Sequence, residues 1–220
     1  MSSDKQERDL SAPSRDHPWG KALSQRKHYA KGGIGHWFRD FRDRKVFSLL
    51  EGKGGWVVDL GCGEGITLEK LKKVFPGKRS VGIDVSRENA KVCRLHGLPA
   101  LCGDVHRLSL KAGTMDACLL MDVIEHIEDP EGVLEEILRV LRPGGSLILV
   151  FPNDGIFFLA RILFLKFREA FHDPGHLQGW NPERMKRLLE KKGFRVRRRM
   201  NLPFLFWPIS LYHLVQAEKP

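Results

Sequence analysis

The sequence predicts an α/β protein with a mostly parallel sheet and helices on both faces. Short apolar runs rich in β-branched residues alternate with stretches of helical periodicity, as in consecutive βαβ units. Glycine and proline residues between the runs supply the turns. At 220 residues the chain suits one domain of this class with a core of ordinary size.

The N-terminal part of the chain lies outside this alternation. Residues 1–18 are polar and charged and are expected to form a disordered tail. Residues 19–220 then form a single domain, which begins with a helical segment over residues 19–52. Within that segment, residues 36–50 carry aromatic and aliphatic side chains at roughly helical spacing, which predicts a helix packed on the domain.

The remaining elements follow in order. Strands are expected at residues 56–60, 80–85, 100–102, 116–121, 146–151, 194–200 and 210–218, and helices at 66–75, 88–97, 130–141 and 181–193. The last of these helices has a proline in its first turn and a glycine after its end, as helices prefer. The RPGG sequence at residues 142–145 predicts a turn.

The loop after the first strand combines glycines with an acid. It reads VVDLGCGEG, from Val57 to Gly65, and its glycines allow a tight turn and close approach of the backbone to a ligand. A nicotinamide-binding GxGxxG loop needs a third glycine at position 66, which is isoleucine here. Asp59 would repel a pyrophosphate, but it suits a ligand with an ammonium group and no phosphate.

Two further acids follow the next two strands. Asp84 lies 25 residues after Asp59, where a carboxylate can accept hydrogen bonds from both hydroxyls of a ribose. Asp104 follows the third strand and could accept from the exocyclic amine of an adenine. Ligands of such sheets bind at the carboxyl ends of the strands. The three acids therefore suit a cationic nucleoside with an amino-acid tail, which points to S-adenosylmethionine.

Five segments carry a family resemblance. VVDLGCGEG, GIDVS, GDVHRL, ACLLMDVIEHIEDP and LRPGGSLILVFPN resemble, in that order, the motifs of the class I S-adenosylmethionine-dependent methyltransferases. The resemblance covers about residues 36–218 and is closest to the small-molecule group that includes the ubiquinone-type O-methyltransferases. It implies a transferase with S-adenosylmethionine as cofactor. It also implies a Rossmann-like sheet of six parallel strands and one antiparallel strand, with residues 210–218 as the antiparallel strand beside residues 194–200.

The resemblance also implies a cofactor site. The glycine loop and its acid would surround the methionine moiety, and the acid after the second strand would take the ribose. Residues after the second and third strands would frame the adenine, and the end of the fourth strand would lie near the sulfonium. The implied residues are Asp59, Gly61, Gly63, Gly65, Asp84, Val85, Asp104, Val105, Met121 and Asp122.

Histidines supply the catalytic candidates. If the acceptor is a hydroxyl group, a general base helps methyl transfer, and histidine suits that role near neutral pH. His126 follows the fourth strand, while His172 and His176 lie between the fifth strand and the next helix. Three readings of the Glu125–His126 pair stay open: it orders its loop, it supplies a base, or it contributes to a divalent-metal site. The last is implied by related quinone methyltransferases with an E-x-x-E-H group.

The acceptor is expected to be small and apolar, and lipid-like or quinone-like. Two aromatic-rich inserts depart from the common core, a cap-like insert at 154–180 and a second at 201–210, and this topology places both on the active-site side. The apolar part of the first insert is too short and too charged to span a bilayer. Core packing, a lid over the acceptor and contact with a membrane surface are its alternative roles.

The net charge of +10 favours anionic surroundings and motivates an RNA methyltransferase as the alternative function. Against it, the sequence contains no separate RNA-binding module. A nucleotide-binding protein without catalysis is a third reading. The absence of CxxC pairs and the polar N-terminus favour a cytoplasmic location, with peripheral membrane contact left open. The sequence does not predict the oligomeric state.

Overall fold

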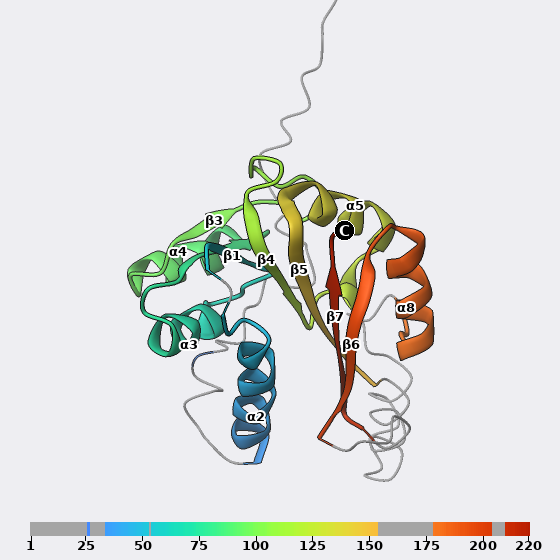
Figure 1. Cartoon of the computed structure of the whole chain (residues 1–220). Coiled ribbons are helices and arrows are strands. Elements are labelled where there is room, and N and C mark those ends of the chain that lie inside the picture. The colour runs from blue at the N-terminus through green and yellow to red at the C-terminus, as the bar shows by residue number, and fades with distance from the viewer. Residues whose placement is uncertain (1–25, 27–33, 53, 154–177, 204–209) are drawn as a thin grey trace, which may run out of the picture.

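A computed structural model describes residues 26, 34–52, 54–153, 178–203 and 210–220. Its centre is a seven-stranded sheet with the order β3-β2-β1-β4-β5-β7-β6 (Figure 1). All neighbouring pairs from β3 to β5 are parallel, whereas β7 runs antiparallel to both β5 and β6. The predicted α/β fold class, with six strands in one direction and one against them, is confirmed.

The element boundaries agree with the predicted ones to within two residues at nearly every end. The strands are β1 (Trp56–Leu60), β2 (Arg79–Asp84), β3 (Ala100–Cys102), β4 (Met115–Met121), β5 (Leu141–Pro152), β6 (Arg195–Leu202) and β7 (Tyr212–Glu218). The helices are α2 (Ile34–Ser48), α3 (Ile66–Val74), α4 (Arg87–Leu95), α5 (Pro130–Val140) and α8 (Pro182–Lys191), with a short 3₁₀ helix η1 (Ile124–His126).

The turn predicted at residues 142–145 is wrong, because these residues belong to β5. The register between β4 and β5 shifts there, since Met115 pairs with Leu141 but Ala117 pairs with Ser146. The extra residues are held by hydrogen bonds to the chain beyond β7. The Pro-Gly-Gly signal therefore marks an irregularity inside a strand, of the kind that a β-bulge produces, and not the end of the strand.

Side-chain caps fix where the helices next to the carboxyl edge of the sheet begin. The side chain of Ser86 accepts a hydrogen bond from the amide of Asn89 at the start of α4, and Asp129 accepts from the amide of Gly132 at the start of α5. Each cap satisfies an amide that has no partner within its own helix. The caps therefore end the loops that follow β2 and β4 at defined points.

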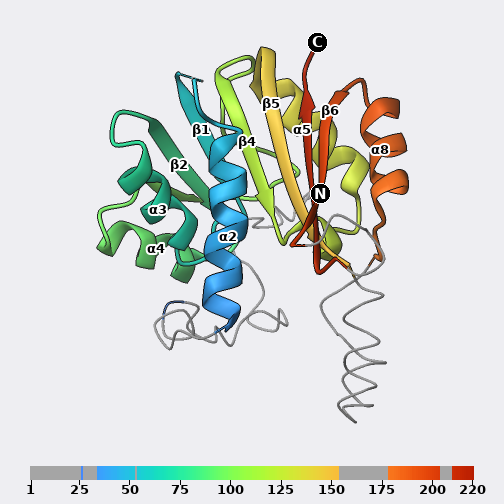
Figure 2. The ribbon, with the colours of Figure 1, turned by 60° about the horizontal axis from the view of Figure 1, so that its bottom comes forward.

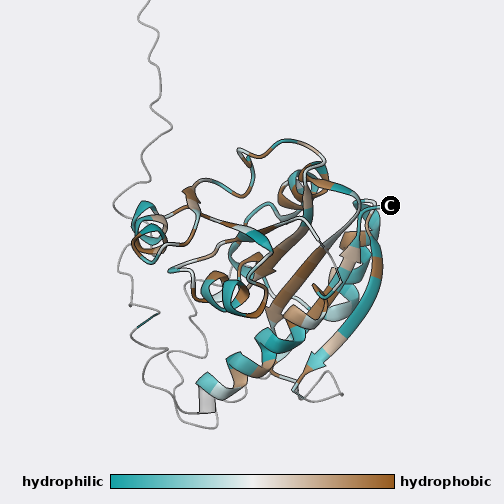
Figure 3. Cartoon of the chain, turned by 60° about the vertical axis from the view of Figure 1, so that its left-hand side comes forward, coloured by the Kyte–Doolittle hydropathy of each residue, from teal (hydrophilic) through white to brown (hydrophobic). Residues whose placement is uncertain are grey.

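Two apolar clusters hold the helices on opposite faces of the sheet. One cluster joins α5 and α8 to the strands through residues such as Ile137 and Leu189, and the other joins α2 and α3 through Phe47 and Leu71. Figure 2 shows α2 crossing the sheet in front of β1 and β4. Hydrophobic residues dominate the central strands, whereas the helices alternate in hydropathy (Figure 3). None of the helices in the described ranges has the length and apolar character needed to cross a membrane.

Candidate functional site

The acids and glycines singled out in the sequence lie at one edge of the sheet, where β1, β2 and β4 end. Asp59 is paired with Gly82 in β2, so β1 and β2 end side by side. The amide of Gly61 donates to the carbonyl of Ile83 at 2.7 Å, which folds the glycine loop over the end of β2. Parallel strands bring their carboxyl ends together, and the predicted placement of the loop follows from this.

The glycine loop requires glycine for both conformation and space. Gly61, Gly63 and Gly65 have φ angles of 71°, 53° and 78°, a region that other residues rarely adopt. A Cβ atom on Gly61 would lie 2.4 Å from Cγ2 of Val123, and one on Gly65 would lie 2.8 Å from Sγ of Cys93. The loop is thus packed tightly between the end of β4 and helix α4.

Asp84 ties the glycine loop to α4. Its Oδ2 accepts a hydrogen bond from the amide of Gly63 at 2.7 Å. Its Oδ1 accepts from the amide of Ser86 at 2.9 Å and from Nδ2 of Asn89 at 3.1 Å. A carboxylate offers about four acceptor positions, so Asp84 keeps capacity for a ligand hydroxyl. The structure adds a role that the sequence did not predict, since this acid also fixes the loop.

Asp59 offers a buried acceptor at the end of β1. Its side chain is only 3% exposed, and its Oδ2 has no hydrogen-bond partner within the described residues. Burial, reinforced by Asp43, Cys93 and Asp84 nearby, raises the pKa of Asp59 to about 8. A ligand ammonium group would supply the missing donor and lower that pKa again. This orphaned oxygen therefore fits the amino group of S-adenosylmethionine.

Arg42 of α2 is a site residue that sequence reasoning missed. Its Nη1 donates to Oδ2 of Asp122, and its Nε and Nη2 donate to Oδ1 of Asp43 at 3.3 and 3.2 Å. Its guanidinium also lies 5.6 Å from the ring centroid of Tyr212. Burial lowers the pKa of Arg42, but attraction to Asp122 and Asp43 outweighs it, and the net pKa is raised. Two of the five guanidinium N–H groups remain for a ligand.

A signal for Arg42 was present in the sequence. Phe38, Arg42 and Val46 are spaced four apart, so they share one face of a helix. All three are buried in the structure. A charged residue within an apolar helical stripe is rarely buried unless it is paired. The position of Arg42 therefore indicates that it has a buried partner, although the sequence does not say which residue that partner is.

The end of β4 combines a strained backbone with two acids. Met121 is buried, and Asp122, with φ of 56°, is the sole non-glycine residue of positive φ within the described ranges. Oδ1 of Asp122 is buried and has no hydrogen-bond partner among these residues. An aspartate in this conformation costs about 1–2 kcal/mol, and such strain is common at functional sites. Glu125 follows in η1 and is buried.

Three residues predicted to frame an adenine lie beyond β2 and β3. Val85 is 52% exposed, which leaves an apolar surface next to Asp84. Oδ1 of Asp104 accepts from the amide and from Nδ1 of His106 at 2.9 and 2.8 Å. Burial alone would raise the pKa of Asp104, but the hydrogen bonds from His106 lower it. Val105 is partly buried against the core.

The structure places one of the three candidate catalytic histidines. His126 is partly buried in η1, at the same edge as Asp122. Gln178 holds this loop: its amide donates to the Glu125 carbonyl at 3.3 Å, and its side chain donates to two further carbonyls, of Ile127 and Glu128. His172 and His176 lie outside the described residues.

The described residues also bear on the metal reading of the Glu125–His126 pair. Across these ranges no group of three or more histidine, cysteine, aspartate or glutamate side chains is arranged to hold a metal ion. The four cysteines are free thiols. The metal reading therefore has no support from the part of the site that is described.

Known proteins are similar to this chain in sequence and in fold. The family described as a methyltransferase domain matches residues 58–149. An uncharacterized 37.1 kDa protein of a Streptomyces fradiae transposon is 38% identical over 121 residues, which are 52% of this chain and 35% of that protein. The chain thus spans about a third of the length of this relative.

Two further proteins match most of the chain. The ubiquinone biosynthesis O-methyltransferase of Xanthomonas oryzae is 28% identical over 194 residues, which are 80% of each protein. The crystal structure of an S-adenosylmethionine-dependent methyltransferase from Thermotoga maritima has a TM-score of 0.69 at 22% identity. That match covers 89% of this chain and 96% of the other.

Proposed function

The chain belongs to the class I S-adenosylmethionine-dependent methyltransferases, and from this premise we propose that it methylates a small, apolar acceptor of lipid or quinone type. S-adenosylmethionine is its cofactor. The observation that supports the cofactor part of the proposal is the buried, unpartnered Oδ2 of Asp59, with the buried cation of Arg42 close enough to affect the pKa of Asp59. A carboxylate and a guanidinium group placed in this way suit the ammonium and carboxylate groups of an amino-acid tail.

Each part of the cofactor then has a proposed partner. Asp59 takes the ammonium group, and the remaining N–H groups of Arg42 are available for the carboxylate. The free capacity of Asp84 takes a ribose hydroxyl. The exposed side chain of Val85 and the carboxylate of Asp104 suit the face and the amine of the adenine.

The residues at the end of β4 lie where the acceptor would meet the methyl group. When bound, S-adenosylmethionine supplies a methyl group that is already activated as a sulfonium. The protein must hold the acceptor in line with it, and such positioning can supply much of the rate enhancement. Oδ1 of Asp122 and the imidazole of His126 are the candidate acceptors for a proton from a hydroxyl group.

The chain connections support an apolar acceptor. Tyr212 pairs with Pro152 of β5 and with Leu202 of β6, so both inserts leave the sheet next to this residue. The side chain of Tyr212 lies close enough to Asp122 for that carboxylate to raise its pKa, although burial is the larger cause. Two aromatic-rich inserts therefore start beside the end of β4. The Xanthomonas relative named for ubiquinone biosynthesis supports the same class of acceptor.

The charge distribution disfavours RNA as the acceptor. Arg197 of the edge strand β6 binds Glu218 at 2.9 Å, and Arg199 binds Glu183. Lys191 of α8 is paired with an acid of α5. These three basic residues of β6 and α8 are thus paired with acids, which reduces the positive charge that this described part of the chain offers to phosphates.

The test is a transfer assay with S-adenosylmethionine and a panel of catechols that differ in alkyl chain length. We expect S-adenosylhomocysteine to form and the apparent KM to fall as the chain lengthens. No turnover, together with methylation of transfer RNA, would establish the alternative function. Binding of S-adenosylhomocysteine without turnover of either would favour a non-catalytic nucleotide-binding protein.

Two further experiments test the alternative roles of the Glu125–His126 pair and of the first insert. Titration with a chelator distinguishes a metal site from a base or an ordered loop, because only a metal-dependent reaction loses activity. Sedimentation with anionic liposomes across a salt series tests peripheral membrane contact, which weakens with salt if headgroup charge contributes.

A further inference from the structure

Arg26 binds the glycine loop from an earlier part of the chain. Its backbone amide donates to Oε2 of Glu64 at 2.8 Å, and its Nε donates to the backbone carbonyl of Glu64 at 2.9 Å. Its Nη1 donates to Oε2 of Glu69, in the first turn of α3, at 2.8 Å. Glu64 lies between two glycines of the loop and is only 6% exposed. One arginine thus contacts both the side chain and the backbone of a single loop residue.

These contacts act on a peptide unit that the loop geometry depends on. The carbonyl of Glu64 and the amide of Gly65 belong to the same planar peptide group. The amide of Gly65 donates to the carbonyl of Cys62 at 3.0 Å, while Arg26 holds the carbonyl on the opposite side. Both ends of the peptide are therefore fixed. Without Arg26, this peptide group would lose one of its two hydrogen bonds, and Gly65 on one side of it restricts rotation little.

The guanidinium of Arg26 has a donor that its protein partners do not use. Its Nη2 is buried and has no hydrogen-bond partner among the described residues. Burial of an unpaired charged donor is unfavourable. A group on a bound ligand would satisfy it, as the ammonium group would satisfy Asp59.

We propose that Arg26 is a positioning residue of the cofactor site, which holds the glycine loop in its binding conformation through Glu64. The inference rests on the proposed function only through the cofactor and is independent of the acceptor. It extends the site to a residue 38 positions before the loop that it holds.

Calorimetry with S-adenosylhomocysteine tests the proposal on four proteins: the wild type, Arg26→Gln, Glu64→Ala and the double variant. Loss of a charge-assisted hydrogen bond predicts a roughly tenfold weaker Kd for Arg26→Gln. Arg26→Gln removes the hydrogen bond from Nε to the backbone carbonyl of Glu64, and Glu64→Ala removes the one from the backbone amide of Arg26 to Oε2. Both bonds hold the same two segments together, so once one of them is lost the second substitution should cost less, and the double variant should lose less affinity than the product of the two single losses. Fully multiplicative losses would overturn a route through Glu64.

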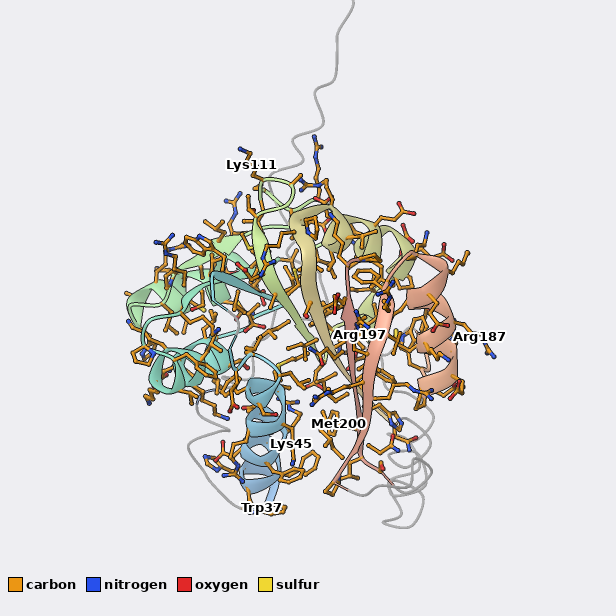
Figure 4. The ribbon with its side chains drawn as sticks, in the orientation of Figure 1. Trp37, Lys45, Lys111, Arg187, Arg197 and Met200 are labelled. Carbon is orange, nitrogen blue, oxygen red and sulfur yellow. The ribbon has the colours of Figure 1, made fainter. Side chains whose placement is uncertain are left out.

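The conservative and control variants separate positioning from general stability. Arg26→Lys keeps the charge but not the fork of donors, so it should recover only part of the affinity. Arg187→Gln is the matched control, since Arg187 lies on α8, across the molecule from α3 (Figure 4). Its Kd should equal that of the wild type. Thermal melting of every variant confirms that the proteins are folded.

A second measurement requires no ligand. Hydrogen exchange of the amides at residues 61–65 in the free protein should be faster in Arg26→Gln than in the wild type, and unchanged in Arg187→Gln. Wild-type exchange and wild-type affinity in Arg26→Gln would overturn the inference. If the wild type binds no S-adenosylhomocysteine, the cofactor assignment falls, and the exchange rates still decide whether Arg26 positions the loop.

Discussion

The guanidinium of Arg42 binds the carboxylate of Asp122, a residue 80 positions later in the chain. This pair connects the buried face of α2 with the strained residue at the end of β4. Helix α2 therefore does more than cover the sheet, since it supplies the cation that balances the acids of the site. The stability of the fold and the geometry of the site are linked at this contact.

Replacement of Arg42 should destabilise the protein strongly. Arg42→Met keeps the approximate size but leaves Asp43 buried without its arginine partner and Asp122 without a counter-ion. Breaking a buried ion pair on one side costs about 3–5 kcal/mol. The cost here should lie near the lower end, because Lys70 still pairs with Asp43 and the side chain of Asp122 is 37% exposed, and chemical denaturation can measure it. Arg44→Met is the control, because Arg44 is exposed on the same helix. Equal effects of the two substitutions would contradict the assigned role.

Asp59 should make the stability of the ligand-free protein fall as pH rises. Its pKa in the folded state, about 8, is above the ordinary value near 4 of an unfolded chain. Between these pH values the folded state binds more protons than the unfolded state. The contribution of protonated Asp59 to the free energy of unfolding is therefore present at low pH and is lost as the pH approaches 8. Denaturation of wild type and Asp59→Asn from pH 5 to pH 9 checks this. The difference between the two proteins should change across that window.

Cofactor binding should lower the raised pKa of Asp59. An ammonium group near Asp59 favours the carboxylate, so affinity for S-adenosylhomocysteine should rise with pH toward about 8, with release of a proton. Calorimetry in buffers of different ionisation enthalpy measures the proton directly. Asp59→Asn should bind more weakly and release none. A proton count that is the same in both proteins would place the ammonium group elsewhere.

The glycine loop predicts a contrast between two substitutions at positive φ. Gly61→Ala combines an unfavourable φ with a contact of 2.4 Å to Val123, whereas Gly97→Ala has a similar φ of 66° and nothing within 4 Å. Gly97→Ala should cost about 1 kcal/mol, and Gly61→Ala should cost about 2–4 kcal/mol and abolish cofactor binding. Thermal melting and calorimetry measure both effects. Val123→Ala should partly rescue Gly61→Ala if the clash is the cause.

Gln178 should influence methyl transfer without affecting the cofactor. Its side chain holds two carbonyls of the loop that carries His126. In Gln178→Ala we expect an unchanged Kd for S-adenosylhomocysteine and a rate of transfer lower by roughly tenfold, because small displacements of reacting groups are costly. Steady-state kinetics on an acceptor from the catechol panel gives kcat and KM separately. A weaker Kd for the cofactor would instead indicate a general structural role.

The parts of the site that sequence could predict are those encoded within a few residues. The acid before the glycine loop, the acid at the end of β2 and the glycines themselves follow from one strand–loop–helix pattern repeated along the chain. Arg26 and Arg42 could not be assigned in this way. Their partners lie 38 and 80 positions away, and tertiary packing alone brings them together.

The wrong turn at residues 142–145 has a related cause. Proline and glycine predict turns through local conformation, but here hydrogen bonds between Lys219 and the Gly144–Gly145 pair keep the segment in the sheet. Gly144 has a φ of 74°, so the local preference is present in the structure and is accommodated inside β5.

The position of β7 between β5 and β6 has a consequence for biosynthesis. β5 and β6 both pair with β7, which is synthesised after them. In the growing chain, the edges of β5 and β6 that will pair with β7 therefore stay unpaired until Glu218 has been added. Such edges are templates for wrong pairing, and pairing over long sequence separations is slow. Translation speed and chaperone access during synthesis of residues 141–218 should therefore influence the yield of folded protein more than changes in β1 to β3.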